Sequence, residues 1–311
     1  MADLNNEEQN QDVAPVAPER RDGVTPSVST SSCGNNNTQV LCPCVGNYIP
    51  AGSAQKVYAI GTLGYDFGSE ARRDSFKQRM EQGFPEIPEN LLAHLGKFPF
   101  DSGALMWTLN IHATPIYAIA PTGPFAQEGF QLLWKFLKGQ VNNEKERIER
   151  ISLPGIITGQ TMLMNGHVVP VVSPDIRGLY GWTSDALVKQ TQNSTQKNTG
   201  VDIKNFLERV YYELENMGVT SEERAMNFAA TKAFNVARIF GDAVNKSLNM
   251  ASIDIKKSAI CRPGSDCQDV ILRFFDPKNK TERAVQMYRF TVDVRDVLPV
   301  TVGEVHSWNE Y

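Results

Sequence analysis

The stretch VYAIGTLGYDFGSEARRDSF, residues 57–76, places three glycines and two arginines where a strand would pass into a helix. Glycines in such a turn let backbone N–H groups approach a phosphate at the helix N-terminus. The dinucleotide motif needs its first two glycines two positions apart, whereas Gly61, Gly64 and Gly68 are three and four positions apart. The spacing therefore favours a bent edge strand followed by a helix that Ser69 caps.

Charged side chains in and beside this helix are the first candidates for recognition. Arg72 and Arg73 could each bind a carboxylate through two parallel hydrogen bonds, and Asp66 and Glu70 lie close to them in the sequence. The alternative is a solvated helix face or an ion pair within the domain. Aromatic residues in loops are further candidates for binding a peptide or a partner, with buried packing as the alternative; they are Tyr180, Trp182 and Trp308.

The five cysteines allow a zinc site. Cys42 and Cys44 bracket a proline, and Cys261 and Cys267 bracket the turn RPGSD, so four thiolates would surround a zinc ion if the two pairs met. Cys33 could add a ligand to the first pair. The gaps of one and five residues differ from the usual two-residue gap of zinc knuckles, so free thiols are the alternative. An odd number of cysteines without a secretory signal argues against a disulfide framework.

Familiar catalytic motifs are not found in the sequence. It has no G-x-x-x-x-G-K-[ST] phosphate loop, no H-E-x-x-H zinc-protease motif and no G-x-S-x-G nucleophile turn. The four histidines lie far apart, and we expect each to be an ordinary core or surface residue. We therefore predict a non-catalytic protein. An enzyme with an unrecognised site is the alternative, and its first suspects are Asp66, Glu70, Arg72, Arg73 and His112.

The composition bounds the class of protein and of partner. The 311 residues are 41% hydrophobic and 21% charged, which is typical of a globular protein, and the net charge of −4 gives no footprint for nucleic acid. No apolar run approaches the ~20 residues of a membrane helix. The N-terminus is acidic and polar, unlike a secretory signal, so we expect a cytoplasmic protein.

The chain divides by composition into a tail and one domain. Residues 1–53 are rich in Asn, Gln, Glu, Ser, Pro and Gly, and we expect them to be disordered because they bury too little apolar surface. Residues 54–311 carry strand and helix patterns in an irregular order, which predicts one α+β domain with a mixed, largely antiparallel sheet. Strand patterns lie at residues 57–61, 115–120, 155–164, 167–172, 269–275 and 286–294.

Turn and helix patterns complete this prediction. Asn165-Gly166 predicts a type I′ hairpin turn, in which both central residues have positive φ, and a second hairpin is expected across residues 276–282. Residues 189–200 form a polar loop. Helices are expected near 124–141, 201–217 and 220–245, the last with a Thr220–Glu223 capping box and a stripe of alanines. Such a stripe could pack in a core or in a homodimer.

Several blocks of the sequence, in order, resemble one known family. They are YAIGTLGYDFGSEARRDSFKQRM (58–80), ALMWTLNIHATPIYAIAPTGPFA (104–126), RISLPGIITGQTMLMNGHVVPVVSPDIRGLYGWTSDALV (150–188) and YRFTVDVRDVLPVTVGEVHSW (288–308). Together they resemble the PatG-type C-terminal domain of unknown function of cyanobactin maturation proteins. In that family the domain follows a subtilisin-like macrocyclase, whose Asp, His and Ser motifs are not found here.

The resemblance implies a role in the maturation of ribosomally made peptides, without supplying a reaction or a catalytic residue. We therefore expect an accessory domain that binds or scaffolds a precursor peptide or a partner maturation enzyme. A peptide-modifying enzyme and a structural dimerisation module are the alternatives.

The composition of the tail leads to a first prediction. Limited proteolysis should remove residues 1–53 and leave a resistant core that begins near Val57, because a polar, proline-bearing segment has little to protect it. Mass spectrometry of the fragments locates the boundary. Collapse of the core once the tail is cut would show that the tail belongs to the fold.

Overall fold

The computed structural model describes most of the expected domain. All described residues belong to one unit, Asn47–Tyr311. The expected tail, the polar loop at 189–200 and most of the expected helix at 201–217 lie outside the described residues, which are 54–80, 83–141, 147–183, 208, 211, 215–231, 239, 243, 246, 248–276 and 285–310.

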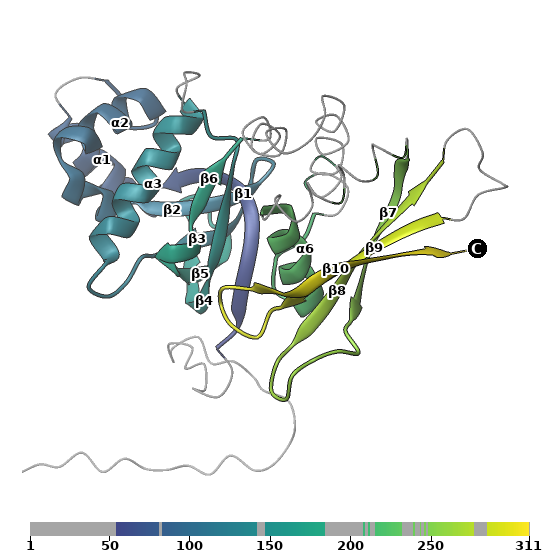
Figure 1. The fold of residues 1–311 in the computed structure, drawn as a ribbon. Coiled ribbons are helices and arrows are strands. Elements are labelled where there is room, and N and C mark those ends of the chain that lie inside the picture. Colours follow the sequence, from purple (N-terminus) through teal and green to yellow (C-terminus); the bar gives the residue numbers. More distant parts are fainter. Residues whose placement is uncertain are drawn as a thin grey trace, which may run out of the picture. The chain divides into compact units, whose positions relative to one another are not determined.

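The first half of the domain is a closed five-stranded barrel (Figure 1). Its strands are β1 (Lys56–Asp66), β2 (Met106–Ile111), β3 (Thr114–Ile119), β4 (Arg150–Met162) and β5 (Val168–Pro174). They follow the order β1-β2-β3-β5-β4, and β4 pairs back onto β1. Only the β3–β5 pair is parallel. With helix α3 (Ala126–Val141) between β3 and β4, this is the connectivity of the OB-fold, a five-stranded Greek-key barrel.

A second, four-stranded antiparallel sheet forms the C-terminal half. Its order is β10-β9-β8-β7, so each strand pairs with its neighbour in sequence. The strands are β7 (Asn249–Lys257), β8 (Cys267–Phe275), β9 (Val285–Asp293) and β10 (Val300–Glu310). The expected second hairpin is confirmed as β8–β9, and the α+β class with largely antiparallel pairing is confirmed with it.

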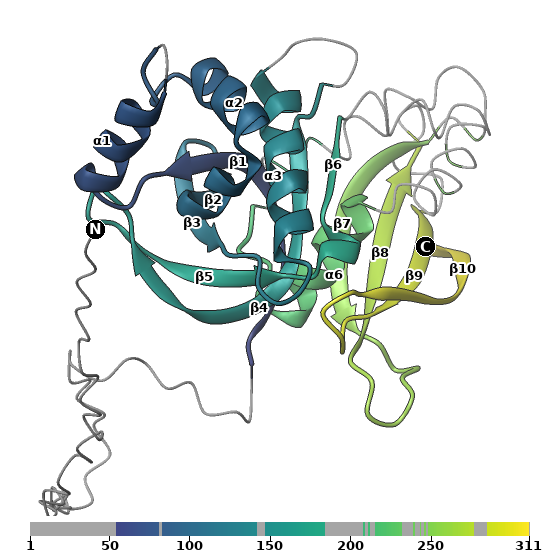
Figure 2. The ribbon, with the colours of Figure 1, turned by 90° about the vertical axis from the view of Figure 1, so that its left-hand side faces the viewer.

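Two of the connections between barrel strands contain helices. Between β1 and β2 lie α1 (Glu70–Arg79), α2 (Pro88–Lys97) and the 3₁₀ helix η1 (Pro99–Ala104). Figure 2 shows α2 and α3 lying across one side of the barrel. A short 3₁₀ helix, η2 (Ile176–Gly178), precedes strand β6 (Tyr180–Trp182), which pairs with the start of β4. Of the expected helix at 220–245, the structure describes α6 (Ser221–Thr231).

Both predicted helix caps are present. Ser69 accepts a hydrogen bond from the backbone N–H of Arg72 at 3.3 Å. At the start of α6, Thr220 Oγ1 accepts from the N–H of Glu223 at 3.2 Å, and Glu223 Oε2 accepts from the N–H of Thr220 at 3.2 Å. This reciprocal pair is the capping box that the sequence indicated.

The predicted β4–β5 hairpin forms, but its turn type differs from the prediction. Gly166 has φ of 84°, whereas Asn165 is not among the described residues with positive φ. The Gly166 N–H donates to Leu163 O, and the Leu163 N–H donates to His167 O. This is a three-residue loop, a type I turn followed by a left-handed glycine, in place of the two-residue type I′ turn. Bonding between Leu163 and His167 lengthens the loop by one residue.

Two hydrophobic cores share strand β1. Val57 and Ala59 lie in the core of the barrel and helices α1–α3, whereas Tyr58 and Ile60 lie in the core formed with α6 and the second sheet. Alternate side chains of a strand point to opposite faces, so β1 serves both cores at once. The alanine stripe of α6, including Ala225 and Ala229, is buried in this second core, so the stripe is used within the chain.

The turn before α6 touches the backbone of β1. Gly218 has φ of 67°, and a Cβ there would lie 2.2 Å from Tyr58 O. The Tyr58 N–H donates to Gly218 O at 2.8 Å, and the Asn227 side-chain amide donates to Tyr58 O at 2.8 Å. The barrel and α6 are therefore joined through backbone atoms that leave no room for a side chain.

Gly218→Ala should destabilise the domain more than Gly166→Ala. Both glycines have positive φ, which costs an alanine about 1–2 kcal/mol, but a Cβ at Gly166 meets nothing within 4 Å. The clash with Tyr58 should add about 1–3 kcal/mol at Gly218. Urea unfolding measures both free energies, and equal losses would refute the proposed close contact.

Candidate functional site

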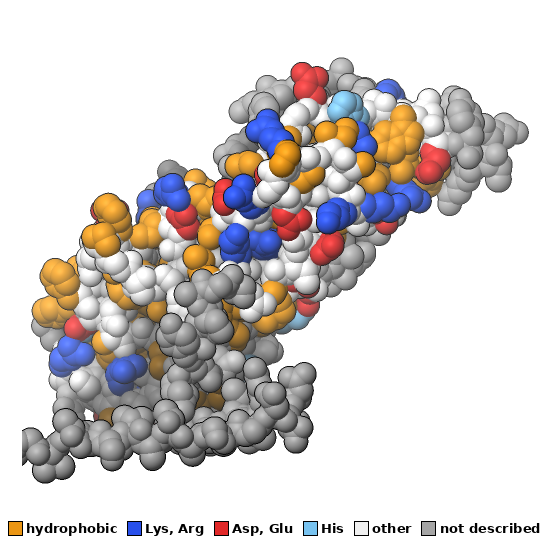
Figure 3. Space-filling view, turned by 90° about the horizontal axis from the view of Figure 1, so that it is seen from below, with side chains coloured by type: hydrophobic (Ala, Val, Ile, Leu, Met, Phe, Trp, Pro, Cys, Tyr) orange, Lys and Arg blue, Asp and Glu red, His pale blue; other side chains and the backbone are white. Residues whose placement is uncertain are grey.

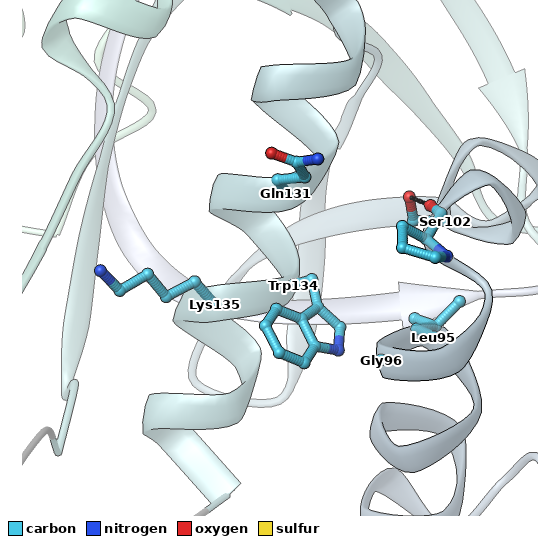
Figure 4. Close-up of a pocket in the computed structure, with 7 residues that line it drawn as sticks. Leu95, Gly96, Ser102, Gln131, Trp134 and Lys135 are labelled. Carbon is cyan, nitrogen blue, oxygen red and sulfur yellow. Dashed lines mark hydrogen bonds between the residues drawn. The ribbon is translucent and has the colours of Figure 1, made fainter.

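An open apolar pocket of about 300 Å³ lies between α2, η1 and α3 (Figure 4). Its described lining residues are Leu95, Gly96, Pro99, Ser102, Gln131, Trp134 and Lys135. Figure 4 shows the Trp134 indole of α3 facing Leu95 and Gly96 of α2, while the Lys135 ammonium points away from them. We call this the α2–α3 pocket. Its volume is at the small end of the range for ligand sites.

Trp134 is held in place at the pocket wall. Its Nε1–H donates to Leu92 O at 3.1 Å, and the Lys138 ammonium lies 5.2 Å from the ring centroid. A Cβ at Gly96 would lie 3.5 Å from Trp134 Cζ2, an ordinary van der Waals distance, so the ring packs directly against this position of α2. The pocket is therefore lined by a fixed aromatic surface that can pack against an apolar side chain.

Phenylalanines flank this pocket in solvent. Phe98 is 49% exposed and Phe100 is 82% exposed, and they stand on either side of Pro99. Phe84 and Ile87, in the connection between α1 and α2, are also exposed. In Figure 3 hydrophobic side chains stand at the surface of the end that carries α1–α3. Exposed apolar patches of this kind commonly mark binding surfaces.

A polar clasp holds η1 against α1 and α2. Asp101 of η1 lies 2.8 Å from His94 Nε2 through one oxygen and 2.7 Å from Arg79 Nη1 through the other. His94 is buried between the rings of Phe76 and Phe98, at centroid distances of 6.0 and 5.0 Å. His94 is thus the satisfied core histidine that the sequence suggested, and the clasp fixes the η1 side of the pocket.

A second cavity is a larger, more open groove of about 680 Å³, lined by residues of β4, β5 and η2 among others. Arg177 bonds Asp175 there through two contacts of 3.1 and 2.7 Å. The Arg177 hydrogen bond lowers the pKa of Asp175, so this carboxylate is ionised and paired. Thr122 and Ser173 are hydrogen-bonded to each other at 2.7 Å. Because these four side chains are paired with one another, we take the α2–α3 pocket as the stronger candidate.

Comparison with known proteins shows which family the chain belongs to. Residues 56–159 match the family model described as "PatG Domain", and residues 193–308 match the model described as "PatG C-terminal". A solved structure described as "PatG Domain of Unknown Function" is 41% identical, with a TM-score of 0.76 over 83% of this chain and 100% of that chain. The chain belongs to the PatG family of domains. No curated protein matches it, and no helix in the described part is long and apolar enough to span a membrane.

The charged candidates of this PatG-family domain make contacts within the fold. Asp66 Oδ1 accepts from the N–H groups of Gly68 at 2.5 Å and Met164 at 3.1 Å, which holds the tip of the β4–β5 hairpin beside the turn after β1. Glu70 is exposed on the first turn of α1. The structure gives Asp66 a positioning role and brings none of these residues into the α2–α3 pocket.

The two arginines of α1 also contact their surroundings. Arg72 Nη1 donates to Phe67 O at 3.1 Å, and Arg73 Nε lies 3.6 Å from Glu86. The Arg73–Glu86 contact is an ion pair within the domain, the alternative that the sequence analysis gave, and the Arg72 bond to a backbone carbonyl was not predicted. Another suspect, His112, lies in the β2–β3 turn with Nε2 at 2.6 Å from Glu215.

The three aromatic candidates lie on β6 and β10, away from the pocket lining. Trp182 packs against the second core, and its Nε1–H donates to the Tyr211 hydroxyl at 3.0 Å. Tyr180 is 54% exposed and Trp308 is 38% exposed, with the Arg289 guanidinium 6.0 Å from the Trp308 centroid. Of the three, Tyr180 and Trp308 keep accessible rings, and Trp182 is mainly a packing residue.

The predicted zinc ligands are only partly within the described residues, because Cys42 and Cys44 lie outside them. Cys261 is exposed in the β7–β8 connection and Cys267 is buried at the start of β8. Burial, and then a hydrogen bond with Cys261, raise the pKa of Cys267 to about 12. No group of three or more metal-binding side chains occurs among the residues that the structure describes.

Sequence reasoning missed the α2–α3 pocket and helix α2 itself. The signal was the segment KFPFD, residues 97–101, which places two phenylalanines around a proline. A proline-bearing connection is exposed as a rule, so aromatic residues in it can be interpreted as binding residues. The sequence analysis instead chose aromatic residues that lie on β6 and β10.

Asp101→Ala should lower the free energy of unfolding by about 2–3 kcal/mol, because it leaves the buried His94 and the Arg79 guanidinium without their shared carboxylate. The matched control is Asp74→Ala, which removes a 58%-exposed carboxylate beside Arg73 and should cost below about 0.5 kcal/mol. Chemical denaturation compares the two. Similar values for both variants would show that the clasp does not hold η1.

Proposed function

We propose that this domain is a non-catalytic accessory domain in the maturation of ribosomally made peptides. In this proposal the α2–α3 pocket binds an apolar side chain of a precursor peptide. The observation that carries the proposal is an open pocket with a fixed tryptophan wall, flanked by two phenylalanines that stand in solvent. Membership of the PatG family supplies the biological setting, since the family resemblance is to cyanobactin maturation proteins.

The chemistry of the pocket supports binding over catalysis. None of its described lining residues is a histidine, cysteine, aspartate or glutamate. The Ser102 hydroxyl is buried and donates its hydrogen to Pro99 O, a backbone carbonyl that cannot act as a general base. Nucleophilic catalysis needs a nucleophile, a base and an orienting group within hydrogen-bond reach. Packing of apolar surface, at about 25 cal/mol per Å², is what such a pocket can supply.

The sizes and positions of the exposed residues favour a peptide chain. One apolar side chain would enter beside Trp134, while the neighbouring residues of the peptide would cross the surface near Phe98 and Phe100. Aromatic residues supply large contact areas at low cost in side-chain entropy, which suits recognition of varied peptide sequences. A partner maturation enzyme that presents an apolar loop is the competing occupant.

Gly96→Leu should block binding without unfolding the domain. The new side chain would point toward Trp134, and leucine is a better helix former than glycine, so α2 should be retained. Titration of a synthetic apolar precursor peptide, followed by tryptophan fluorescence, should show an affinity about tenfold weaker or worse than that of the parent.

Two variants serve as controls for this titration. Trp134→Phe should remove the fluorescence change and so identify the reporter among the four tryptophans. Phe125→Ala removes an exposed phenylalanine that does not line the pocket and should bind as the parent does. Unchanged affinity of the Gly96→Leu variant would rule out the pocket as the peptide site.

A further inference from the structure

Strand β10 is an exposed edge of the second sheet. In the described part of the chain it pairs with β9 alone, and it ends the strand order β10-β9-β8-β7. Its last residues, His306–Glu310, are all exposed. An edge strand presents backbone N–H and C=O groups that can pair with another strand, and proteins usually guard such edges.

The first part of this edge is irregular and the last part is regular, with Gln286 Nε2 donating to Trp308 O at 3.0 Å. The register with β9 shifts between Val302 and His306, because two extra residues of β10 are accommodated there. Such a bulge bends the strand and disrupts further pairing. From His306, opposite Arg289, to Glu310, opposite Val285, the register is regular. An added strand would therefore find a straight edge only at residues 306–310.

The side chains of this straight segment complement a second copy of themselves. In an antiparallel pair centred on Trp308, His306 of each copy lies opposite Glu310 of the other, Ser307 lies opposite Asn309, and the two Trp308 rings meet. The His306 imidazole can donate a hydrogen bond to the Glu310 carboxylate of the other copy, and aromatic cross-strand pairs stabilise a sheet by roughly 0.2–1 kcal/mol. A pairing centred on Ser307 would instead place two glutamates, Glu304 and Glu310, opposite each other.

Side chains of the neighbouring strand β9 support this arrangement. His306 and Trp308 lie opposite Arg289 and Met287, so these four side chains share one face of the sheet. Met287 is buried, and the Arg289 guanidinium lies 6.0 Å from the Trp308 centroid. The Trp308 ring therefore has supporting neighbours on this face.

We propose that two copies of this chain associate through antiparallel pairing of β10, centred on Trp308, to form a continuous eight-stranded sheet. The interface uses five residues from each copy. It is small beside the roughly 1,200–2,000 Å² that stable complexes bury, so the dimer is weak and forms with rising protein concentration. This proposal is independent of peptide binding in the α2–α3 pocket.

Charge reversal tests both the pairing and its register in the full chain. His306→Glu should place two glutamates opposite each other, and Glu310→Lys should place lysine opposite His306. Sedimentation velocity over a concentration series should then show the dissociation constant of each single variant raised about tenfold or more. Glu304→Lys, the matched control in the bulge, should dimerise as the parent does.

Mixing the two single variants is the decisive arm. In a heterodimer of His306→Glu with Glu310→Lys, the introduced glutamate lies opposite the introduced lysine, and the unchanged Glu310 of one copy lies opposite the unchanged His306 of the other. Association should therefore return on mixing, and this recovery also shows that both variants are folded. The proposal is overturned if the parent stays monomeric at its highest soluble concentration, if the single variants dimerise normally, or if mixing restores nothing.

Discussion

The pairing of β1 with two partners is the constraint on which the rest of the structure depends. Its first six residues pair with β4 and its last five with β2, so one strand closes the barrel. A one-residue slip would exchange the side chains of the two cores. Gly61 stands where the partner changes, and a Cβ there would lie 2.4 Å from Asn110 O. Gly61 and Gly64 therefore serve close packing of strands, whereas Gly68 has a φ of 72° in the turn after β1.

The pocket follows from how the barrel joins β1 to β2. Residues 67–105 leave the barrel, form α1, α2 and η1, and return, and the clasp of Asp101 with His94 and Arg79 fixes this excursion. Trp134 on α3 then faces α2 across an unfilled space. Phe100 is 82% exposed and Phe98, which covers one side of His94, is 49% exposed, although Phe76 is fully buried. An exposed phenylalanine contributes less to the stability of the fold than a buried one. We therefore relate these exposed residues to binding.

Local patterns in the sequence predicted the parts of the fold that local interactions determine. The caps at Ser69 and Thr220, helix α3 and both hairpins are confirmed, because each rests on residues that are neighbours in the chain. The closure of the barrel was not predicted, since β1 and β4 are about ninety residues apart and no short pattern specifies their pairing. Strands β2, β6, β7 and β10 were also not predicted.

The candidate site was less predictable than the fold. Charged residues such as Asp66 and Arg72 stood out in the sequence, yet they bond to backbone groups of their own domain. The pocket is made by residues of ordinary type, and only the approach of α2 to α3 gives them a common surface.

The most direct test of the central claim is a nuclear magnetic resonance titration of the labelled domain with an apolar precursor peptide. The account predicts that the indole N–H signal of Trp134, which is bonded to Leu92 O, shifts together with backbone signals of α2 and η1. The indole signals of Trp182 and Trp308 should stay in place. Shifts at Trp182 or Trp308, with none at Trp134, would contradict the account.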